Sequence, residues 1–552
     1  METEWFAQYD VVVVGSGASG LTAAITAENH GFKTLLIEKM DTWGGSTAYS
    51  GGGLWIPNNF LMQEDGALDS EEEALEYMEA VIADVGPASS RARKEAYVRE
   101  APKMVNFLKS LGFEWTRAQY YPDYYPNVKG GKTGRVIEST IFNGKKLKQW
   151  RKTQNVSPGM PPIAITSGDA YLLSLVVRTM KGFRRTMKIM GQTLGWLLSG
   201  KYPLGIGLAL TGRLMYILRS KYQGEVWLKA PLQELIMEDG KVIGLKVEKD
   251  GKTLNIKANK AVLLGAGGFP HGGEYRRKYQ PVGSEYSSAS PGNTGDAIRA
   301  GETVGAALSL MDEAWWGGSF ILDGKVSFSV TERSLPGCII VDSRGKRFVN
   351  ESTSYVDLGR RMLDHDAQKG GGAVPSWLIM DSTYRKNYLF GMMPPGQTPS
   401  KYLKSGEFVK AGSLKDLATQ CKIDADNLEE TVKRFNSFAK NGKDEDFMRG
   451  QDIYDRYYSD PRVAPNSNLA ALEKAPFYAT RIYPGDLGTK GGLLTDEYAR
   501  VLREDGSVIE GLYASGNNTA SVMGRTYPGP GSTIGPACTF SYIAMNHLAG
   551  KV

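Results

Sequence analysis

The sequence predicts an α/β protein with a Rossmann-like nucleotide-binding unit near its start, and consecutive features support this. Residues Val11–Val14 are four valines in a row, which is typical of a strand buried on both faces of a parallel sheet. A G-x-G-x-x-G motif at 15–20 follows, and a helix-favouring stretch runs from it to Gly31, which can cap a helix C-terminus. A second apolar strand at 33–37 then ends at Glu38.

Each glycine of this motif has a physical role. Gly15 allows the tight turn, Gly17 lets the backbone approach a pyrophosphate, and Gly20 lets helix and strand pack closely. The helix N-terminus supplies free N–H groups, and Glu38 can accept hydrogen bonds from a ribose. The bare motif could also be a glycine-rich turn without a ligand, but the complete order of strand, glycines, helix, strand and acid favours a nucleotide. The predicted contacts are Gly15, Ser16, Gly17, Ala18, Ser19, Gly20, Glu38 and Lys39.

Further glycine-rich segments favour a flavin over a nicotinamide cofactor. A second loop at 44–53 follows the acidic residue, and a longer cofactor needs such additional backbone N–H donors. The segments 260–269 and 511–517 resemble strand-and-turn segments that form part of the flavin site in flavoproteins. The segment 535–549 is predicted to be a helix whose N-terminus faces the flavin. The additional predicted contacts are Gly45, Ser46, Thr47, Ser50, Gly51, Gly52, Ala266, Gly267, Gly516, Asn517 and Gly535.

Together these pieces resemble the fumarate reductase and 3-ketosteroid dehydrogenase superfamily of flavoproteins. The resemblance implies FAD and a Rossmann-like FAD-binding domain of the glutathione-reductase type, interrupted by an α+β catalytic domain. A chain of 552 residues is also too long for a single hydrophobic core. We expect residues 1–313 and 488–552 to form the FAD-binding domain and residues 314–487 to form the catalytic domain.

Other motifs select a branch of that superfamily. The segment 526–537 resembles the TYPGxGxxIG motif of 3-ketosteroid Δ1-dehydrogenases. The segments 121–124, 312–316 and 347–355 resemble other motifs of the same enzymes, which occur in the same order along the chain. The corresponding fumarate reductase strand would carry a histidine, which residues 485–493 lack. The resemblance therefore implies an enzyme that introduces a double bond between carbons 1 and 2 of a 3-ketosteroid such as cholest-4-en-3-one.

The resemblance also implies the role of individual residues. The hydroxyl of Tyr527 and the backbone N–H of Gly531 would bind the ketone oxygen, and Tyr355 would take the proton from carbon 2. A second tyrosine would assist Tyr355. We assign it to Tyr124, while Tyr120 or Tyr121 remains an alternative because the register of the 120–125 run is open. Tyrosine has an ordinary pKa near 10, so the base needs such assistance at neutral pH.

Two other functions stay open at this point. One is a 3-ketosteroid Δ4-(5α)-dehydrogenase, which acts at carbons 4 and 5, although the intact 527–531 motif favours the Δ1 reaction. The other is a membrane sterol carrier that keeps FAD as a structural part. A net charge of +6 is mild for this length and does not indicate nucleic acid. Three widely spaced cysteines and four dispersed histidines predict no disulfide framework and no metal site, and indicate a reducing compartment.

Residues 181–222 form a cationic, apolar insertion. Its uncharged runs, 189–200 and 202–212, are each shorter than the roughly 20 residues of a spanning helix. We expect a helical hairpin that lies in the membrane interface, with its cations on anionic headgroups. A helical pair packed on its own domain, or a dimer contact, is the alternative. With no signal peptide at the N-terminus, we expect a cytoplasmic protein on the inner face of the membrane. The oligomeric state and the electron acceptor stay open.

Overall fold

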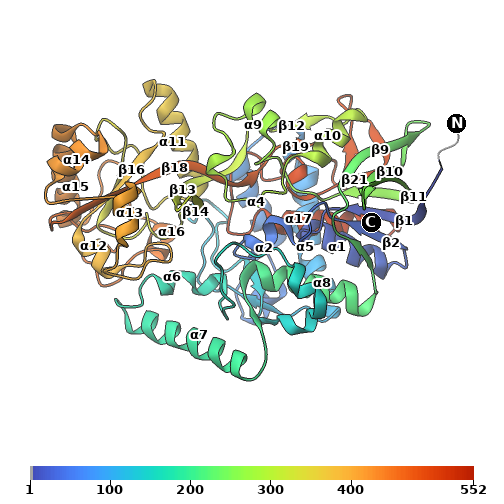
Figure 1. Ribbon diagram of the computed structural model, residues 1–552, viewed down its shortest axis with the longest axis horizontal. Coiled ribbons are helices and arrows are strands. Elements are labelled where there is room, and N and C mark those ends of the chain that lie inside the picture. The colour runs from blue at the N-terminus through green and yellow to red at the C-terminus, as the bar shows by residue number, and fades with distance from the viewer. Residues whose placement is uncertain (1–3) are drawn as a thin grey trace.

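The computed structural model describes residues 4–552 and contains two regions, each built around a β-sheet (Figure 1). The first region has an eight-stranded sheet, to which the beginning, the middle and the end of the chain contribute strands. The second has a six-stranded sheet, whose strands all lie within residues 314–489. In Figure 1 the first region lies on the right, together with both chain ends, and the second on the left.

The centre of the eight-stranded sheet is parallel. Strand β1 (Ala7–Val14) lies between β2 (Thr34–Ile37) and β11 (Lys252–Leu264), with both pairings parallel. Strand β21 (Val508–Ala514) pairs in parallel with β11 on its other side. The remaining strands of this sheet are β8 (Glu225–Trp227), β9 (Leu232–Glu238), β10 (Lys241–Lys249) and β20 (Arg500–Leu502). The predicted Rossmann-like α/β fold is confirmed.

The valines of β1 are buried on both faces of the sheet. Val11 and Val13 pack in the hydrophobic cluster that contains helix α1 (Ala18–Asn29), whereas Val12 and Val14 pack in a different cluster. Helix α1 also packs against the C-terminal helix α17 (Ile534–Leu548). The uninterrupted valine run therefore reflects a strand covered on two sides.

The structure corrects part of the prediction for residues 181–222. Helices α7 (Met180–Leu198) and α8 (Ile206–Lys221) both form, but α8 does not face outward. It is buried along most of its length and packs against α1 and α2 (Gly45–Tyr49). Its apolar run belongs to the protein core, and hydrophobic content alone does not distinguish a core helix from a helix that faces lipid.

Helix α7 lies at the lower edge of the molecule in Figure 1, away from both sheets. Most of its large apolar side chains are exposed: Met180, Phe183, Met187, Met190, Leu194, Leu197 and Leu198. Across residues 4–552, none of the helices combines the length and the hydropathy that crossing a membrane requires.

The six-stranded sheet is antiparallel and supports the second region. Helix α11 (Tyr355–Lys369) packs on its two central strands. The strands are β13 (Ala314–Leu322), β14 (Lys325–Phe328), β15 (Cys338–Val341), β16 (Ser376–Met380), β17 (Phe408–Ala411) and β18 (Phe477–Thr489). Helix α15 (Ala425–Asn441) begins after Asp424, whose side chain accepts a hydrogen bond from the Asn427 N–H.

A small sheet and further helices surround the two large sheets. The small sheet near the site consists of β3 (Leu54–Trp55), β4 (Trp115–Arg117) and β5 (Val136–Ser139). The remaining α-helices are α3 (Phe60–Glu64), α4 (Glu71–Ile82), α5 (Arg91–Ser110), α6 (Ala170–Leu173), α9 (Gly273–Tyr279), α10 (Asp296–Thr303), α12 (Ser382–Asn387), α13 (Ser400–Ser405), α14 (Leu414–Cys421) and α16 (Ile453–Tyr457).

Candidate active site

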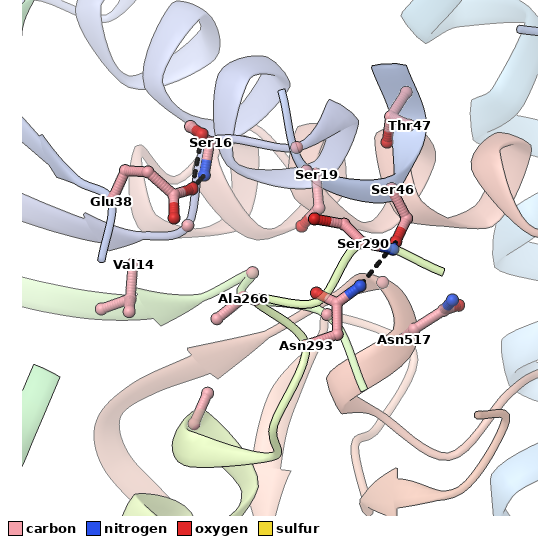
Figure 2. Close-up of a pocket in the computed structure, with 18 of the residues that line it drawn as sticks. Val14, Ser16, Ser19, Glu38, Ser46, Thr47, Ala266, Ser290, Asn293 and Asn517 are labelled. Atoms are coloured by element: carbon pink, nitrogen blue, oxygen red, sulfur yellow. Dashed lines mark hydrogen bonds between the residues drawn. The ribbon is translucent and has the colours of Figure 1, made fainter. Parts of the chain in front are cut away.

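An open cavity with about 970 Å³ of empty volume lies where β1, β2 and β11 end (Figure 2). Segments far apart in the sequence meet around it, which places most of the predicted cofactor residues in one site. The predicted residues that line the cavity are Gly15, Ser16, Gly17, Ala18, Ser19, Glu38, Lys39, Gly45, Ser46, Thr47, Ala266, Gly267, Gly516 and Asn517.

Other predicted cofactor residues lie behind the cavity wall. Gly20 packs against the turn at Gly15, and a Cβ at Gly52 would lie 2.5 Å from the backbone of Ile206 in α8. Ser50 accepts a backbone hydrogen bond from Gly207 (N···O 3.0 Å), which fixes the 50–52 loop on the same helix. A Cβ at Gly535 would lie 2.6 Å from the hydroxyl of Tyr97. The structure therefore gives these residues packing contacts and does not place them in the cavity lining.

The glycine loop fits a pyrophosphate. Gly15 has φ +98°, and a Cβ there would lie 2.6 Å from the Cα of Ala266. At Gly17 a Cβ would meet only the Oγ1 of Thr47, at 3.5 Å, so the backbone at this residue faces open space. No side chain of Gly17 caps the N-terminus of α1, and although the Ala18 N–H donates to Thr47 Oγ1 at 3.1 Å, the other N–H groups of the first turn can bind a phosphate.

Glu38 lies at the end of β2 and is held by the same loop (Figure 2). Its carboxylate accepts hydrogen bonds from the Ser16 hydroxyl at 2.6 Å and from the Ser16 N–H at 3.1 Å. Burial raises the pKa of Glu38, and these hydrogen bonds act in the opposite direction. A carboxylate in this position can accept hydrogen bonds from a ribose hydroxyl, as expected for FAD.

One wall of the cavity is formed by residues that were not predicted from the sequence. Asn293 donates to the Ser46 hydroxyl at 2.5 Å, and the Ser290 N–H donates to the same oxygen at 2.9 Å (Figure 2). Both belong to an irregular loop without a recognisable motif. The only available signal was the density of serine, glycine and asparagine at 288–295. Lys39 pairs with Asp296 at 2.6 Å and so fixes this loop.

The close contact at Gly20 leads to a testable prediction. A Cβ at Gly20 would lie 1.8 Å from the carbonyl oxygen of Gly15, so Gly20→Ala must displace the loop. We expect purified Gly20→Ala protein to lose most of its FAD, measured by absorbance after denaturation, and to unfold at a lower temperature. The control is Gly31→Ala, where φ is +78° but the space is open. It should cost only about 1 kcal/mol and retain FAD. Full flavin content in Gly20→Ala would contradict the prediction.

Three buried tyrosines meet beside the cavity. Tyr355 is the first residue of α11, Tyr527 precedes α17, and Tyr124 follows β4. Their ring centroids are 5.4 Å apart for Tyr124 and Tyr355, 5.2 Å for Tyr124 and Tyr527, and 5.3 Å for Tyr355 and Tyr527. The structure thus brings together the predicted base, the predicted ketone-binding phenol and the tyrosine assigned to assist.

A tight turn places Gly531 next to Tyr527. Gly531 has φ +92°, and a Cβ there would lie 2.4 Å from the carbonyl oxygen of Gly53. Burial raises the pKa of Tyr527, whereas hydrogen bonds that involve Thr533 and the Gly531 backbone lower it. The turn at Gly531 and the phenol of Tyr527 therefore lie close together.

Trp315 connects the tyrosines to the cofactor cavity. Its ring packs edge-on against Tyr527 at a centroid distance of 4.8 Å. Its Nε1–H donates to the side-chain oxygen of Asn517 at 3.1 Å, and Asn517 lines the cavity. Trp315 thus bridges the two halves of the site.

The tyrosines of the 120–125 run have different environments. Tyr120 is 62% exposed, and its ring lies 5.2 Å from the Lys181 amine. Tyr124 is buried against Tyr355, and its N–H donates to the Pro528 carbonyl at 2.9 Å. The structure places Tyr124 in the cluster and Tyr120 outside it.

Asp123 fixes the loop that carries Tyr124. Its carboxylate accepts hydrogen bonds from the Trp55 indole at 2.7 Å and from Arg135 at 2.8 Å. Burial raises the pKa of Asp123 to about 6, and Arg135 opposes this shift. Arg135 also pairs with Asp69 at 2.7 Å. Asp69, Arg135 and Asp123 thus form a buried ionic cluster that holds the loop carrying Tyr124 in place.

Comparisons with known proteins agree with this geometry. A family model described as "FAD binding domain" matches residues 10–534. The 3-oxosteroid 1-dehydrogenase of Mycolicibacterium smegmatis is 44% identical, covering 98% of this chain and 97% of its own. The crystal structure of the 3-ketosteroid Δ1-dehydrogenase of Sterolibacterium denitrificans, in complex with 1,4-androstadiene-3,17-dione, has a TM-score of 0.93 at 38% identity and covers 99% of this chain and 100% of its own.

A more distant structure shares only the fold. The 3-ketosteroid-Δ4-(5α)-dehydrogenase of Rhodococcus jostii RHA1 has a TM-score of 0.69 at 21% identity, covering 99% of this chain and 98% of its own. The similarity is therefore much greater to the Δ1 enzymes over the whole length. The chain belongs to the FAD-binding family and, within it, to the 3-oxosteroid 1-dehydrogenases.

Proposed function

We propose that this protein removes hydrogen from carbons 1 and 2 of a 3-ketosteroid and uses FAD as the hydride acceptor. The observation that carries the proposal is the contact of Tyr355, Tyr124 and Tyr527 with one another beside Gly531 and the cofactor cavity. We also propose that residues 314–487 form the catalytic domain and supply the base, and that residues 488–552 of the FAD-binding domain supply the groups that bind the ketone.

Tyr527 and Gly531 stabilise the enolate. A proton next to a ketone becomes acidic only when the negative charge that develops on the oxygen is stabilised. The Tyr527 hydroxyl and the Gly531 N–H would donate to this oxygen as a preorganised pair. Pro528 and Pro530 flank Gly529 in the turn between them and limit its flexibility.

Tyr355 takes the proton from carbon 2. It is buried, and burial raises its pKa well above the usual value, whereas a side-chain hydrogen bond with Tyr124 lowers it. The hydrogen bond with Tyr124 therefore increases the fraction of Tyr355 that is deprotonated, and so able to take a proton, at a given pH. Bound FAD, held by the residues that line the cavity, would supply the acceptor for the hydride that leaves carbon 1. The N-terminal residues Ile534 and Ala537 of α17 line the cavity, so the helix dipole favours negative charge there.

Anaerobic flavin bleaching tests this function against its rivals. Adding androst-4-ene-3,17-dione or cholest-4-en-3-one to the holoenzyme should bleach the flavin, and mass spectrometry with NMR should identify the 1,4-diene. A sterol carrier with structural FAD would not bleach. A Δ4-(5α)-dehydrogenase would bleach only with a 5α-reduced steroid and would form a 4-ene. Either result would replace the proposal.

We further propose that helix α7 binds the inner face of the cell membrane. Its exposed side chains include Lys181, Arg184 and Lys188 as well as the apolar residues named above, and the helix contains no acidic residue. An exposed apolar face with adjacent cations fits an anionic bilayer surface. Steroids that keep a side chain dissolve poorly in water, so a membrane position would favour such substrates.

Introducing negative charge on the apolar face of α7 tests the membrane proposal. Leu194 and Leu198 are 57% and 80% exposed, and we expect the double variant Leu194→Glu/Leu198→Glu to bind anionic vesicles at least about tenfold less. The matched control is Met392→Glu/Met448→Glu, which makes the same charge change at exposed sites of the other region. Sedimentation with phosphatidylglycerol vesicles measures both, and turnover of soluble androstenedione should not change. Equal sedimentation of the two variants would contradict the proposal.

A further inference from the structure

Basic side chains hold the backbone immediately before Tyr527. The carbonyl oxygen of Thr526 accepts a hydrogen bond from the Lys490 amine at 2.7 Å. The carbonyl oxygen of Arg525 accepts one from the Arg360 guanidinium at 2.6 Å. Two successive peptide carbonyls are therefore fixed by side chains that come from two other segments of the chain, and the turn that carries Tyr527 begins from an anchored point.

Lys490 connects the segments that surround this turn. It follows β18 directly and is completely buried. Its backbone N–H donates to the Glu313 carbonyl at 3.0 Å, and its own carbonyl accepts from the Ser521 N–H at 3.1 Å. Its amine lies 4.3 Å from the centre of the Trp315 ring, which in turn packs against Tyr527. The backbone of Lys490 is thus fixed on both sides, and its side chain reaches both the turn and the ring that supports Tyr527.

A lysine at this buried position is costly for the fold. Among residues 4–552 no carboxylate forms an ion pair with Lys490, and the carboxylate of Glu313 pairs instead with Arg525 at 2.7 Å and with Arg360 at 3.3 Å. Burial lowers the pKa of Lys490 to about 7, and Glu313 acts in the opposite direction. The ammonium and the neutral amine can both donate to a carbonyl, so the contact with Thr526 does not depend on the charge. A methionine would fill a similar space without this desolvation cost, so stability alone does not account for the lysine.

Arg360 connects the same turn to the helix that carries the proposed base. It lies in the second turn of α11, which begins at Tyr355. Its guanidinium bonds to the Arg525 carbonyl and to Glu313, and Glu313 also pairs with the Arg525 side chain. Tyr355 and Tyr527 are therefore joined by a backbone route through α11 and the turn, in addition to the contact between their rings.

The proposed reaction requires this alignment, because one rigid ring must meet both groups. The ketone oxygen and carbon 2 belong to the same steroid ring, so the separation between them is fixed. The donors at Tyr527 and Gly531 must therefore lie at a matching separation from the hydroxyl of Tyr355. A displacement of about 1 Å can lower a rate by on the order of 10²-fold. A turn that is anchored before the steroid arrives avoids this loss.

We propose that Lys490 and Arg360 are positioning residues, which hold the two carbonyls before Tyr527 and so align the ketone-binding turn with Tyr355. Neither residue lines the cofactor cavity, and both act through the backbone of the turn. This inference rests on the proposed function and adds to it the contacts that keep the base and the ketone-binding group at a fixed separation.

Removing either contact should lower the maximal rate of flavin reduction and leave steroid binding nearly unchanged. We expect Lys490→Met and Arg360→Met each to reduce flavin about tenfold more slowly at saturating androst-4-ene-3,17-dione, with a steroid dissociation constant within about threefold of the wild-type value. Arg360→Lys keeps a cationic donor and should recover most of the rate. The matched control is Arg361→Met, an exposed position on the same helix, which should keep the wild-type rate. Anaerobic stopped flow with the holoenzyme measures all four variants.

A double-mutant cycle with Tyr527→Phe separates positioning from a general effect on the fold. Where the Tyr527 hydroxyl is absent, Lys490→Met has less to misalign and should slow flavin reduction by less than about threefold. A residue with a purely structural role would slow the wild-type and Tyr527→Phe enzymes by the same factor, and that result would overturn the inference.

Thermal melting and flavin content verify that each variant is folded. If Lys490→Met does not retain FAD, Arg360→Met carries the same cycle, because the Arg360 side chain is 34% exposed and its loss disturbs the core less. Wild-type rates in Lys490→Met and Arg360→Met would also refute the inference, although the dehydrogenase function would stand. If the steroid does not bleach the wild-type flavin at all, the proposed function itself fails.

Discussion

We expect Tyr527→Phe to lower the rate of flavin reduction by androst-4-ene-3,17-dione by about 10²–10³-fold, because it removes one of two donors to the enolate oxygen. The ring should stay in place, since it packs against Tyr124, Tyr355 and Trp315. Anaerobic stopped-flow absorbance of the flavin measures this rate at saturating steroid. The loss should appear in the maximal rate, because the oxygen becomes strongly basic only as the proton leaves.

A matched variant separates this effect from the general loss of a buried hydroxyl. Tyr275 is also buried, and its hydroxyl donates to Glu302 at 2.5 Å, but it lies beside α10 and outside the tyrosine cluster. Tyr275→Phe should therefore reduce flavin at the wild-type rate. If Tyr527→Phe raised only the steroid concentration needed for half saturation, the hydroxyl would contribute to ground-state binding and not to the chemistry.

The nucleotide-binding unit could be predicted because its signals are local. Each of β1, the glycine loop, α1, β2 and Glu38 contributes its feature within one continuous stretch, and a Cβ at Gly15 or Gly20 would clash with the backbone. Tyr355, Tyr527 and Gly531 were predicted from motif resemblance, and their proximity was inferred. The structure supplies the ring distances that join segments about 170 residues apart.

Other parts of the site depend on contacts that no local pattern encodes. Ser290 and Asn293 reach the cavity from an irregular loop, and Tyr458 reaches Tyr121 from a different region of the chain. The apolar run of α8 shows a different kind of error, in which a visible sequence pattern was assigned to the wrong environment. The uncharged run at 202–212 was visible in the sequence, but burial against α1 and exposure to lipid produce similar sequences. Tertiary packing decides between them.

Tyr355→Phe should cause the other large loss, because it removes the group that takes the proton from carbon 2. General-base catalysis contributes about 10²–10⁴-fold, and we expect flavin reduction to slow by a factor in that range. The phenyl ring can keep its edge-on contacts with Tyr124 and Phe328, so the site should stay folded. Steroid should still bind, and its dissociation constant, measured from the perturbed flavin spectrum, should change by less than about threefold.

Isotope exchange distinguishes the base from the ketone-binding group. In D₂O, the wild-type enzyme should exchange the carbon-2 proton of bound androstenedione, and mass spectrometry of the recovered steroid should detect the deuterium. Tyr355→Phe should abolish this exchange, because no group remains at that position to move the proton. Tyr527→Phe should retain slow exchange, because the base is present while the enolate is less stable. Exchange at the wild-type rate in Tyr355→Phe would exclude this tyrosine as the base and would move the role to Tyr124, whose ring lies against it.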